Sequence, residues 1–451
     1  MLKDQMLWLT MSERISDEIK QSDFEGRMID GLREKAEEIL QMENGEEKEK
    51  KSRKLLEELE NAPQRPDFSY IEPEAYTDIE KLLPVDSNKK YNLDPENVRD
   101  KVQGAWYGRA IGCMLGIPIE GWTREKINSF VRESGQYPVT GFFHSNVGEE
   151  IREKYNINDV DYEKRYDRPV ICWKNNVQSF PVDDDINYTV MGLRLIESYG
   201  KDFSSEDVME NWLLSIPVLH ACTAERVAIQ NTLSSVYPTK SGSYLNPYRE
   251  WIGAQIRADF FGYINPGNPK EAAAMAYREG SVSHTKNGIY GEMYVSAMIS
   301  LAFVSTDALW ICKEALKQIP PKSRLAESIH YVIDMKEKGA SFEEVIDTFH
   351  GAYNETEFYG WCHVIPNAVV VVASILWSDD YSQGIINSVL AGFDTDCNGA
   401  TVGSILGVMN GFQKIDTMWL DDIEPILNTS VNRYNRLSIE EVVDRTITLL
   451  S

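Results

Sequence analysis

Two series of glycines, each repeating every fourth residue, constrain the fold of this chain more than any other feature. The first series is Gly104, Gly108, Gly112 and Gly116, and the second is Gly399, Gly403, Gly407 and Gly411. Each glycine in a helix interior costs up to ~1 kcal/mol relative to alanine, so eight of them require a structural reason. At this spacing they form a smooth stripe against which another backbone can pack closely. The two series therefore predict two buried, tightly packed helices.

Acidic residues lie at one end of each glycine series. Glu120 follows the first series, and Asp394 and Asp396 directly precede the second. If the two helices pack antiparallel, the end of the first meets the start of the second. We therefore expect the carboxyl groups of Glu120 and Asp394 to lie close together.

A second acidic cluster, Asp183-Asp184-Asp185, precedes an apolar segment at 188–198. Acids at a helix N-terminus can act as caps and interact favourably with the helix dipole, but a cap needs only one or two. Three adjacent carboxylates repel one another unless a cation or solvent screens them. Oxygen ligands of this kind suit Mg²⁺, Mn²⁺ or Ca²⁺. Helix capping and metal binding both remain open from this cluster alone.

The rest of the chain predicts an all-α fold. Amphipathic segments lie at 188–199, 205–215, 270–279, 290–304, 324–337, 342–353, 383–391, 398–412 and 438–450. Residues 1–62 carry 17 acids and 11 bases and predict one or two exposed helices, followed by a proline-containing linker. We therefore predict a helical extension and linker over 1–90, which packs on the body or on a partner subunit. A single large helical domain is expected over 91–451.

Composition excludes several classes of protein. There are 46 Lys and Arg residues against 71 Asp and Glu, and the net charge of −25 argues against nucleic acid as a general partner. No apolar run approaches the ~20 residues of a membrane span. The first residues do not resemble a signal peptide, and the six cysteines form no CxxC pair. These features predict a cytoplasmic protein with no membrane partner, and they leave its oligomeric state open.

Three motifs in order resemble those of the ADP-ribosylglycohydrolase family, which includes dinitrogenase reductase-activating glycohydrolase and the ADP-ribosyl-acceptor hydrolases. The motifs are GRAIGCMLGIPIEGW (108–122), VDDDINYTVMGL (182–193) and GFDTDCNGATVGSILG (392–407). A fourth segment, 281–303, lies where the family has a histidine-containing loop and an alanine-rich helix. The resemblance covers about residues 97–450 and leaves the first ~90 unmatched.

The resemblance implies an all-α fold around two Mg²⁺ ions, with Mn²⁺ as a possible substitute. By position it implies metal ligands at Asp183, Asp184, Asp185, Asp394 and Asp396. It also implies catalytic roles for Glu120, Asp184 and Asp394 in hydrolysing an N- or O-glycosidic bond at the ribose C1 of an ADP-ribosyl group.

The sequence departs from the family pattern at three places. The aspartate of the opening element is Cys113, the final threonine of the last element is Cys397, and the middle element has three consecutive acids. Because a thiol is a poor ligand for Mg²⁺, water or Asp185 would take its place. A smaller ribosyl compound is therefore an expected substrate beside an ADP-ribosylated acceptor.

Further candidates come from local context. We expect substrate contacts from His284, Asn287 and Gly288, which lie in a polar turn, and from Trp361 and His363; a helix-cap, surface or core-packing role is the alternative for these residues.

For two acids outside these motifs, an ion pair within the fold is the simpler interpretation. Asp259 is either half of a buried Arg–Asp pair or a site acid. Glu225 with Arg226 is most simply an intrahelical charge pair at a helix start.

Two other functions fit parts of this pattern. One is a non-catalytic module of the same fold that binds a ribosyl group or ADP-ribose. The other is an α-helical enzyme of the isoprenoid-synthase type, because Asp183-Asp184-x-x-Asn187 loosely mimics the DDxxD motif that binds diphosphate through Mg²⁺. Metal binding without turnover of any ribosyl compound would favour the non-catalytic module.

Overall fold

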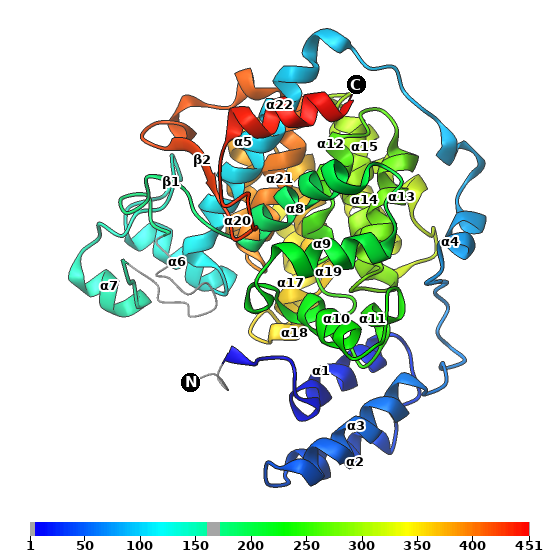
Figure 1. Cartoon of the computed structure of the whole chain (residues 1–451). Helices are drawn as coiled ribbons and strands as arrows, with labels where there is room; N and C mark the ends of the chain where they lie inside the picture. The colour runs from blue at the N-terminus through cyan, green and yellow to red at the C-terminus, as the bar shows by residue number, and fades with distance from the viewer. Residues whose placement is uncertain (1–4, 160–171, 451) are drawn as a thin grey trace.

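The structure, a computed structural model, describes residues 5–159 and 172–450 and is mainly helical, as predicted. The helices of the body surround a central pair, α5 and α21 (Figure 1). The helices of the body, with the central pair included, are α5 (Val98–Gly116), α6 (Arg124–Glu133), α7 (Glu149–Tyr155), α8 (Asp184–Tyr199), α9 (Ser205–Ser215), α10 (Thr223–Leu233), α11 (Lys240–Ser243), α12 (Asp259–Tyr263), α13 (Pro269–Gly280), α14 (Lys286–Ala302), α15 (Ala308–Ala315), α16 (Arg324–Glu337), α17 (Phe342–Ala352), α18 (Phe358–Cys362), α19 (Val364–Leu376), α20 (Tyr381–Leu390), α21 (Thr395–Asn410) and α22 (Ile439–Leu450).

A small three-stranded sheet lies at one side of the helical body (Figure 1). Its strands are β1 (Ser179–Phe180), β2 (Glu424–Asn428) and β3 (Arg436–Ser438). β1 pairs parallel to β2, and β2 pairs antiparallel to β3. The sheet connects the chain just before α8 with the segment before α22.

The glycines of α5 and α21 pack against one another in antiparallel order. A Cβ atom on Gly104 would lie 2.2 Å from the carbonyl oxygen of Gly407, and one on Gly108 would lie 2.1 Å from that of Gly403. Any side chain larger than hydrogen would therefore force these helices apart. The antiparallel packing expected from the sequence is confirmed.

Gly411 has a different role from the other glycines. It caps α21 at its C-terminus with φ of +83°, a left-handed conformation that favours glycine. Seven members of the two series thus lie within α5 and α21, whereas the eighth ends a helix.

All nine segments predicted as amphipathic helices are helical in the structure. α19 was missed because every residue from Val364 to Leu376 is buried. A helix that is apolar on all sides has no amphipathic pattern to recognise.

The N-terminal extension forms three helices, α1 (Met11–Phe24), α2 (Leu32–Leu40) and α3 (Glu46–Glu60), where one or two were expected. They share a small hydrophobic core that also includes Leu245 of the body. The extension therefore packs on the body, and its helices are not simply exposed.

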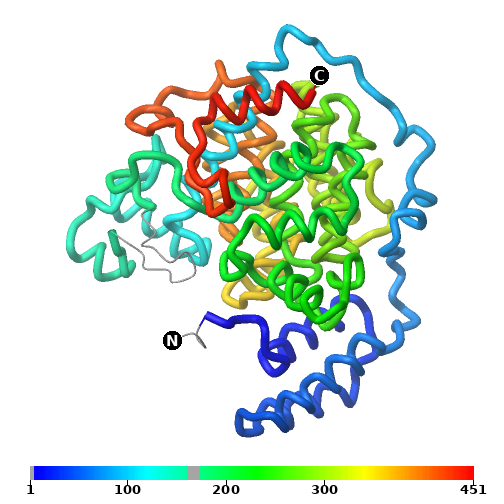
Figure 2. The backbone as a smooth tube through the Cα atoms, viewed as in Figure 1, coloured from blue at the N-terminus to red at the C-terminus, as the bar shows by residue number. Residues whose placement is uncertain are grey.

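The following segment, which contains α4 (Tyr76–Leu82), runs along the outside of the body to the start of α5 (Figures 1 and 2). It is tied there by backbone hydrogen bonds such as Ile71 N to Lys322 O, at 2.9 Å.

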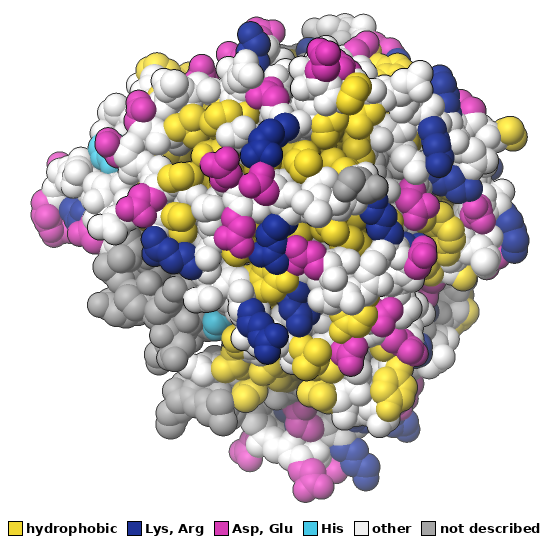
Figure 3. Space-filling view, turned by 45° about the horizontal axis from the view of Figure 1, so that its top comes forward, with side chains coloured by type: hydrophobic (Ala, Val, Ile, Leu, Met, Phe, Trp, Pro, Cys, Tyr) yellow, Lys and Arg dark blue, Asp and Glu magenta, His cyan; other side chains and the backbone are white. Residues whose placement is uncertain are grey.

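The charged residues of the surface are mixed. Acidic and basic side chains are interspersed on the face that Figure 3 shows. Within 5–159 and 172–450, every helix is too short or too polar to cross a membrane.

Candidate functional site

The first part of the candidate site lies where α5 ends and α21 begins. The Thr395 hydroxyl donates a hydrogen bond to the carbonyl oxygen of Gly116 at 2.9 Å, which ties the two helix ends together. Glu120 directly follows the short 3-10 helix after α5. Carboxylate oxygens of Glu120, Asp394 and Asp396 lie within 4.8 Å of one another. The expectation that Glu120 and Asp394 lie close together is therefore confirmed.

A strained turn sets the direction of Asp394. Gly392 and Phe393 both have positive φ, of +81° and +57°, and a bulky side chain rarely adopts this conformation. The Asp394 amide donates to the Asn367 side-chain oxygen at 3.1 Å. Trp361 donates its indole N–H to the Phe393 carbonyl oxygen at 2.6 Å. The turn is thus held from α19 and α18, with both of its acids facing the end of α5.

The start of α8 adds three more acids. Asp183 is the N-cap of α8 and accepts a hydrogen bond from the Asp185 amide at 2.9 Å. Ligand oxygens of Asp183, Asp184, Asp185 and Asp396 all lie within 4.8 Å of one another. Capping and clustering thus coexist at this helix, since one acid caps while all three face α21.

A buried arginine, Arg109 of α5, fixes one of these acids. Its guanidinium lies 2.9 Å from Asp185 and 2.9 Å from Asp259, and all three side chains are fully buried. Asp259 is therefore half of a buried Arg–Asp pair, with Arg109 as its partner. The second oxygen of Asp185 has no hydrogen-bond partner within the described part of the chain, so it is free to face the cluster.

The electrostatics of the cluster require protons or cations. Burial, reinforced by Glu120 and Asp394, raises the pKa of Asp396 well above its usual value. One Asp396 oxygen, like that of Asp185, is buried and unpartnered among the described residues. A set of carboxylate oxygens with unused lone pairs fits a hard divalent cation. These residues could therefore hold a metal ion.

Two thiols border the same acids. The Cys113 sulfur lies within 4.8 Å of ligand oxygens of Asp183 and Asp185, and the Cys397 sulfur lies equally close to those of Asp185 and Asp396. Burial raises the pKa of both thiols well above the usual range. As neutral thiols they contribute little to binding a hard cation.

A cavity of about 240 Å³ opens above the acids. Four acids of the cluster line it: Glu120, Asp184, Asp394 and Asp396. Four aromatic residues, Trp8, Trp251, Phe358 and Trp361, also line it. Of the residues that we predicted as substrate contacts, Trp361 thus lines this cavity.

Glu225 also lines the cavity, and the sequence had suggested another role for it. It pairs with Arg257, which also binds Glu279 at 2.7 Å, and all three are buried. The suggested pair with Arg226 is wrong, because Arg226 binds backbone carbonyls instead. Burial raises the pKa of Glu225 to about 7. A buried partner distant in sequence leaves no local signal, so the pair with Arg257 and the place of Glu225 in the cavity were missed.

The other predicted substrate contacts lie in a buried polar layer under the extension. The Asn287 amide donates to Glu72 at 2.8 Å and to Glu250 at 3.1 Å. His363 lies 3.8 Å from Glu250.

His284 and Gly288 belong to the same region. The His284 ring bonds the Ser283 hydroxyl at 2.8 Å, and a Cβ on Gly288 would meet the Arg249 carbonyl oxygen at 2.5 Å. These two residues, like Asn287 and His363, do not line the cavity. Direct contact with substrate stays a prediction for all four.

The fold and site define a helical protein with an acidic, potentially metal-binding centre between two glycine-packed helices and a third helix N-terminus. Comparison with known proteins agrees with this class. The family model of ADP-ribosylglycohydrolase matches residues 94–450. The chain belongs to this family.

Two similar proteins extend the comparison. An uncharacterised protein of Archaeoglobus fulgidus is 21% identical over 330 residues, which is 72% of this chain and 92% of that protein. A solved structure described as an ADP-ribosylglycohydrolase-related protein complex has a TM-score of 0.50 and 17% identity. That match covers 79% of this chain and 98% of the other, and it supports the fold.

Proposed function

We propose that the protein is a Mg²⁺-dependent hydrolase that cleaves an N- or O-glycosidic bond at the ribose C1 of an ADP-ribosyl or smaller ribosyl compound. One observation carries the proposal: acids from three separate segments lie together beside a cavity, and Asp185 and Asp396 each have a buried oxygen without a hydrogen-bond partner in residues 5–159 and 172–450. Family membership supplies the class of reaction. The isoprenoid-synthase alternative explains neither the family match nor the glycine-packed helices.

The acids of the site have two proposed roles, metal binding and catalysis, according to where they lie. Asp183, Asp184, Asp185, Asp394 and Asp396 would hold the metal, through the oxygens that lie within 4.8 Å of one another. Bound Mg²⁺, in one or two ions, would orient ribose hydroxyls and a water molecule and lower the pKa of that water. Mn²⁺ has the same preference for oxygen ligands and could replace it.

Glu120, Asp184 and Asp394 line the cavity and would face the scissile bond. Their carboxylates would stabilise positive charge that develops on the ribose ring, and one would exchange a proton with water or the leaving group. Burial of the cluster strengthens these interactions because little water competes.

The size of the cavity favours a small ligand. Pockets for drug-sized ligands usually have volumes of about 300–1,000 Å³, and this cavity has about 240 Å³. It fits a ribose and its C1 substituent better than a whole ADP-ribosyl group. The remainder of a larger substrate would lie outside it.

The test is release of free ribosyl product with Mg²⁺ from ADP-ribosyl-arginine, ADP-ribosyl-serine and simple ribosides. We expect turnover of at least one, abolished by a chelator and by Asp394→Asn. Asp334→Asn, on an exposed part of α16, is the matched control and should keep wild-type activity. Metal binding without turnover of any compound would instead support the non-catalytic binding module.

A further inference from the structure

The N-terminal segment before α1 contributes one residue to an aromatic wall of the cavity. Trp8 lines the cavity, although it lies outside the family match at 94–450. Its ring is parallel to that of Phe358 within 9°, with ring centroids 6.5 Å apart. Phe358 in turn lies 5.0 Å from Trp251 and 5.1 Å from Trp361. Four aromatic rings thus form one wall, and the extension supplies one of them.

The backbone at Trp8 is held in an unfavourable conformation. Its φ is +67°, in the left-handed region that bulky residues rarely adopt. Such conformations persist only where surrounding contacts enforce them, and they are concentrated at functional sites.

Two arginines enforce this conformation. Arg226 donates to the Gln5 carbonyl oxygen at 2.9 Å, and its guanidinium lies 4.6 Å from the centre of the Trp8 ring. Arg14 is fully buried and donates to the Trp8 carbonyl oxygen at 2.9 Å and to that of Leu245 at 3.0 Å. Trp8 is thus held by one arginine from the body and one from α1.

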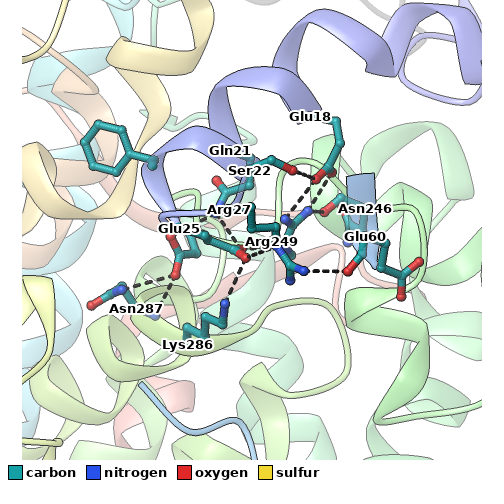
Figure 4. A network of polar contacts seen from close by, with 12 residues as sticks. Glu18, Gln21, Ser22, Glu25, Arg27, Glu60, Asn246, Arg249, Lys286 and Asn287 are labelled. Carbon is teal, nitrogen blue, oxygen red and sulfur yellow. Dashed lines mark hydrogen bonds and ion pairs between the residues drawn. The ribbon is translucent and has the colours of Figure 1, made fainter. Parts of the chain in front are cut away.

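The helix that follows is anchored as firmly. Arg249 of the body lies between Glu18 of α1 and Glu25 just after it, at 2.6 and 2.8 Å (Figure 4). Lys286 lies 2.8 Å from the second oxygen of Glu25. Because Arg249 and both glutamates are buried, separation of α1 from the body would expose or strand these charges. The position of Trp8 is therefore a fixed part of the molecule.

We infer that Trp8 is a specificity-determining residue, which stacks with the aromatic wall against a planar group on the ribose C1 of the substrate. The inference rests on the proposed function and deepens it. The acids lie together and would face the ribose, and the four rings of the wall line the same cavity, so a C1 substituent that extends away from the acids would meet these rings. Aromatic rings bind planar rings and planar cations by stacking and cation–π attraction. The wall therefore favours ribosyl compounds with a planar C1 group over those with a saturated one.

The test uses two ribosides that differ only at C1: nicotinamide riboside, with a planar cationic ring, and methyl riboside, with a saturated substituent. Kd is measured by calorimetry with Mg²⁺ for the wild type, Trp8→Ala and Trp8→Phe, and KM and kcat wherever turnover occurs. Trp377→Ala is the matched control, because Trp377 is also partly buried and near a cation but lies outside the cavity. Thermal unfolding of each variant monitors folding.

We expect Trp8→Ala to raise Kd and KM for nicotinamide riboside about tenfold, the loss typical of one stacking contact. Methyl riboside binding and kcat should stay unchanged, Trp8→Phe should restore most of the affinity, and Trp377→Ala should have no effect. An equal effect on both ribosides, or none, would overturn the inference. A rise in kcat/KM would also overturn it, since Trp8 would then obstruct the site.

Failure of the proposed function gives a different result. If the wild type binds nicotinamide riboside without turnover of any ribosyl compound, the hydrolase proposal fails, whereas the Kd comparison still decides the role of Trp8. If the wild type binds neither riboside, the inference on Trp8 is overturned, whereas turnover of ADP-ribosyl-arginine and ADP-ribosyl-serine still decides the hydrolase proposal.

Discussion

A Cβ atom on Gly112 would lie 1.9 Å from the carbonyl oxygen of Gly399 and 2.4 Å from its carbonyl carbon. In the reverse direction, a Cβ on Gly399 would meet the Gly112 carbonyl oxygen at 2.3 Å. Both obstacles are backbone atoms of core helices, so neither can move aside as a flexible side chain could. The same two helices position Glu120 and Asp394, which makes this contact part of the foundation of the site.

Gly112→Ala should therefore destabilise the protein. Overpacking of a rigid core typically lowers the free energy of unfolding by about 1–3 kcal/mol, and a backbone clash belongs at the upper end. Gly351→Ala in α17 is the control, because nothing lies within 4 Å of its added Cβ. That variant should match the wild type or gain up to ~1 kcal/mol. Denaturant unfolding measures both, and equal midpoints for the two variants would contradict the packing account.

Arg109→Met should be more damaging. It leaves Asp185 and Asp259 buried without their cation, and loss of one partner of a buried pair typically costs about 3–5 kcal/mol. Arg445→Met is the control: Arg445 pairs with Glu197 and Glu441 at a partly exposed site, where such pairs contribute about 1 kcal/mol or less. Unfolding free energies that fall equally in the two variants would refute a special role for the buried arginine.

The extension should come loose when its anchor is removed. Arg249→Met leaves the buried Glu18 without a cation and leaves Glu25 with Lys286 and Arg27 alone, so α1–α3 should detach and become accessible to trypsin at their many Lys and Arg residues. Lys20→Met removes an exposed pair with Glu357 and should leave the cleavage pattern unchanged. Resistance of Arg249→Met to proteolysis would show that the hydrophobic contacts alone hold the extension.

Asp17 of α1 gives the extension a pH dependence. Burial raises the pKa of Asp17 to about 6, above the model-peptide value near 3.9. Between these values the folded state binds the extra proton, so the stability contributed by Asp17 falls as pH rises from about 4 to about 6. Asp17→Asn should thus be more stable than the wild type at pH 8 and nearly equal to it at pH 4. A difference in thermal midpoint that does not change with pH would contradict this.

The sequence predicted the parts of the site that have local signals. Glycine spacing identified the α5–α21 packing, and acids beside those helices identified the cluster. Arg109 and Glu225 were missed because their partners, Asp259 and Arg257, are distant in sequence, and ion pairs between distant residues leave no periodic pattern.

The contribution of Trp8 could not be predicted for a similar reason. An aromatic residue before a charged helix gives no indication that the chain folds back onto a cavity. His284 and His363 have polar, turn-like contexts that resemble a binding site, yet the structure places them in the layer that supports the extension.

The central claim is that the acids from α8 and α21 hold divalent cations for hydrolysis. Anomalous diffraction from crystals grown with Mn²⁺ tests it most directly, because Mn²⁺ takes the same oxygen ligands as Mg²⁺. We predict an anomalous peak among Asp183, Asp184, Asp185, Asp394 and Asp396, which is lost in Asp394→Asn. A cluster without a peak in the wild type, its carboxylates held together by shared protons alone, would contradict the account.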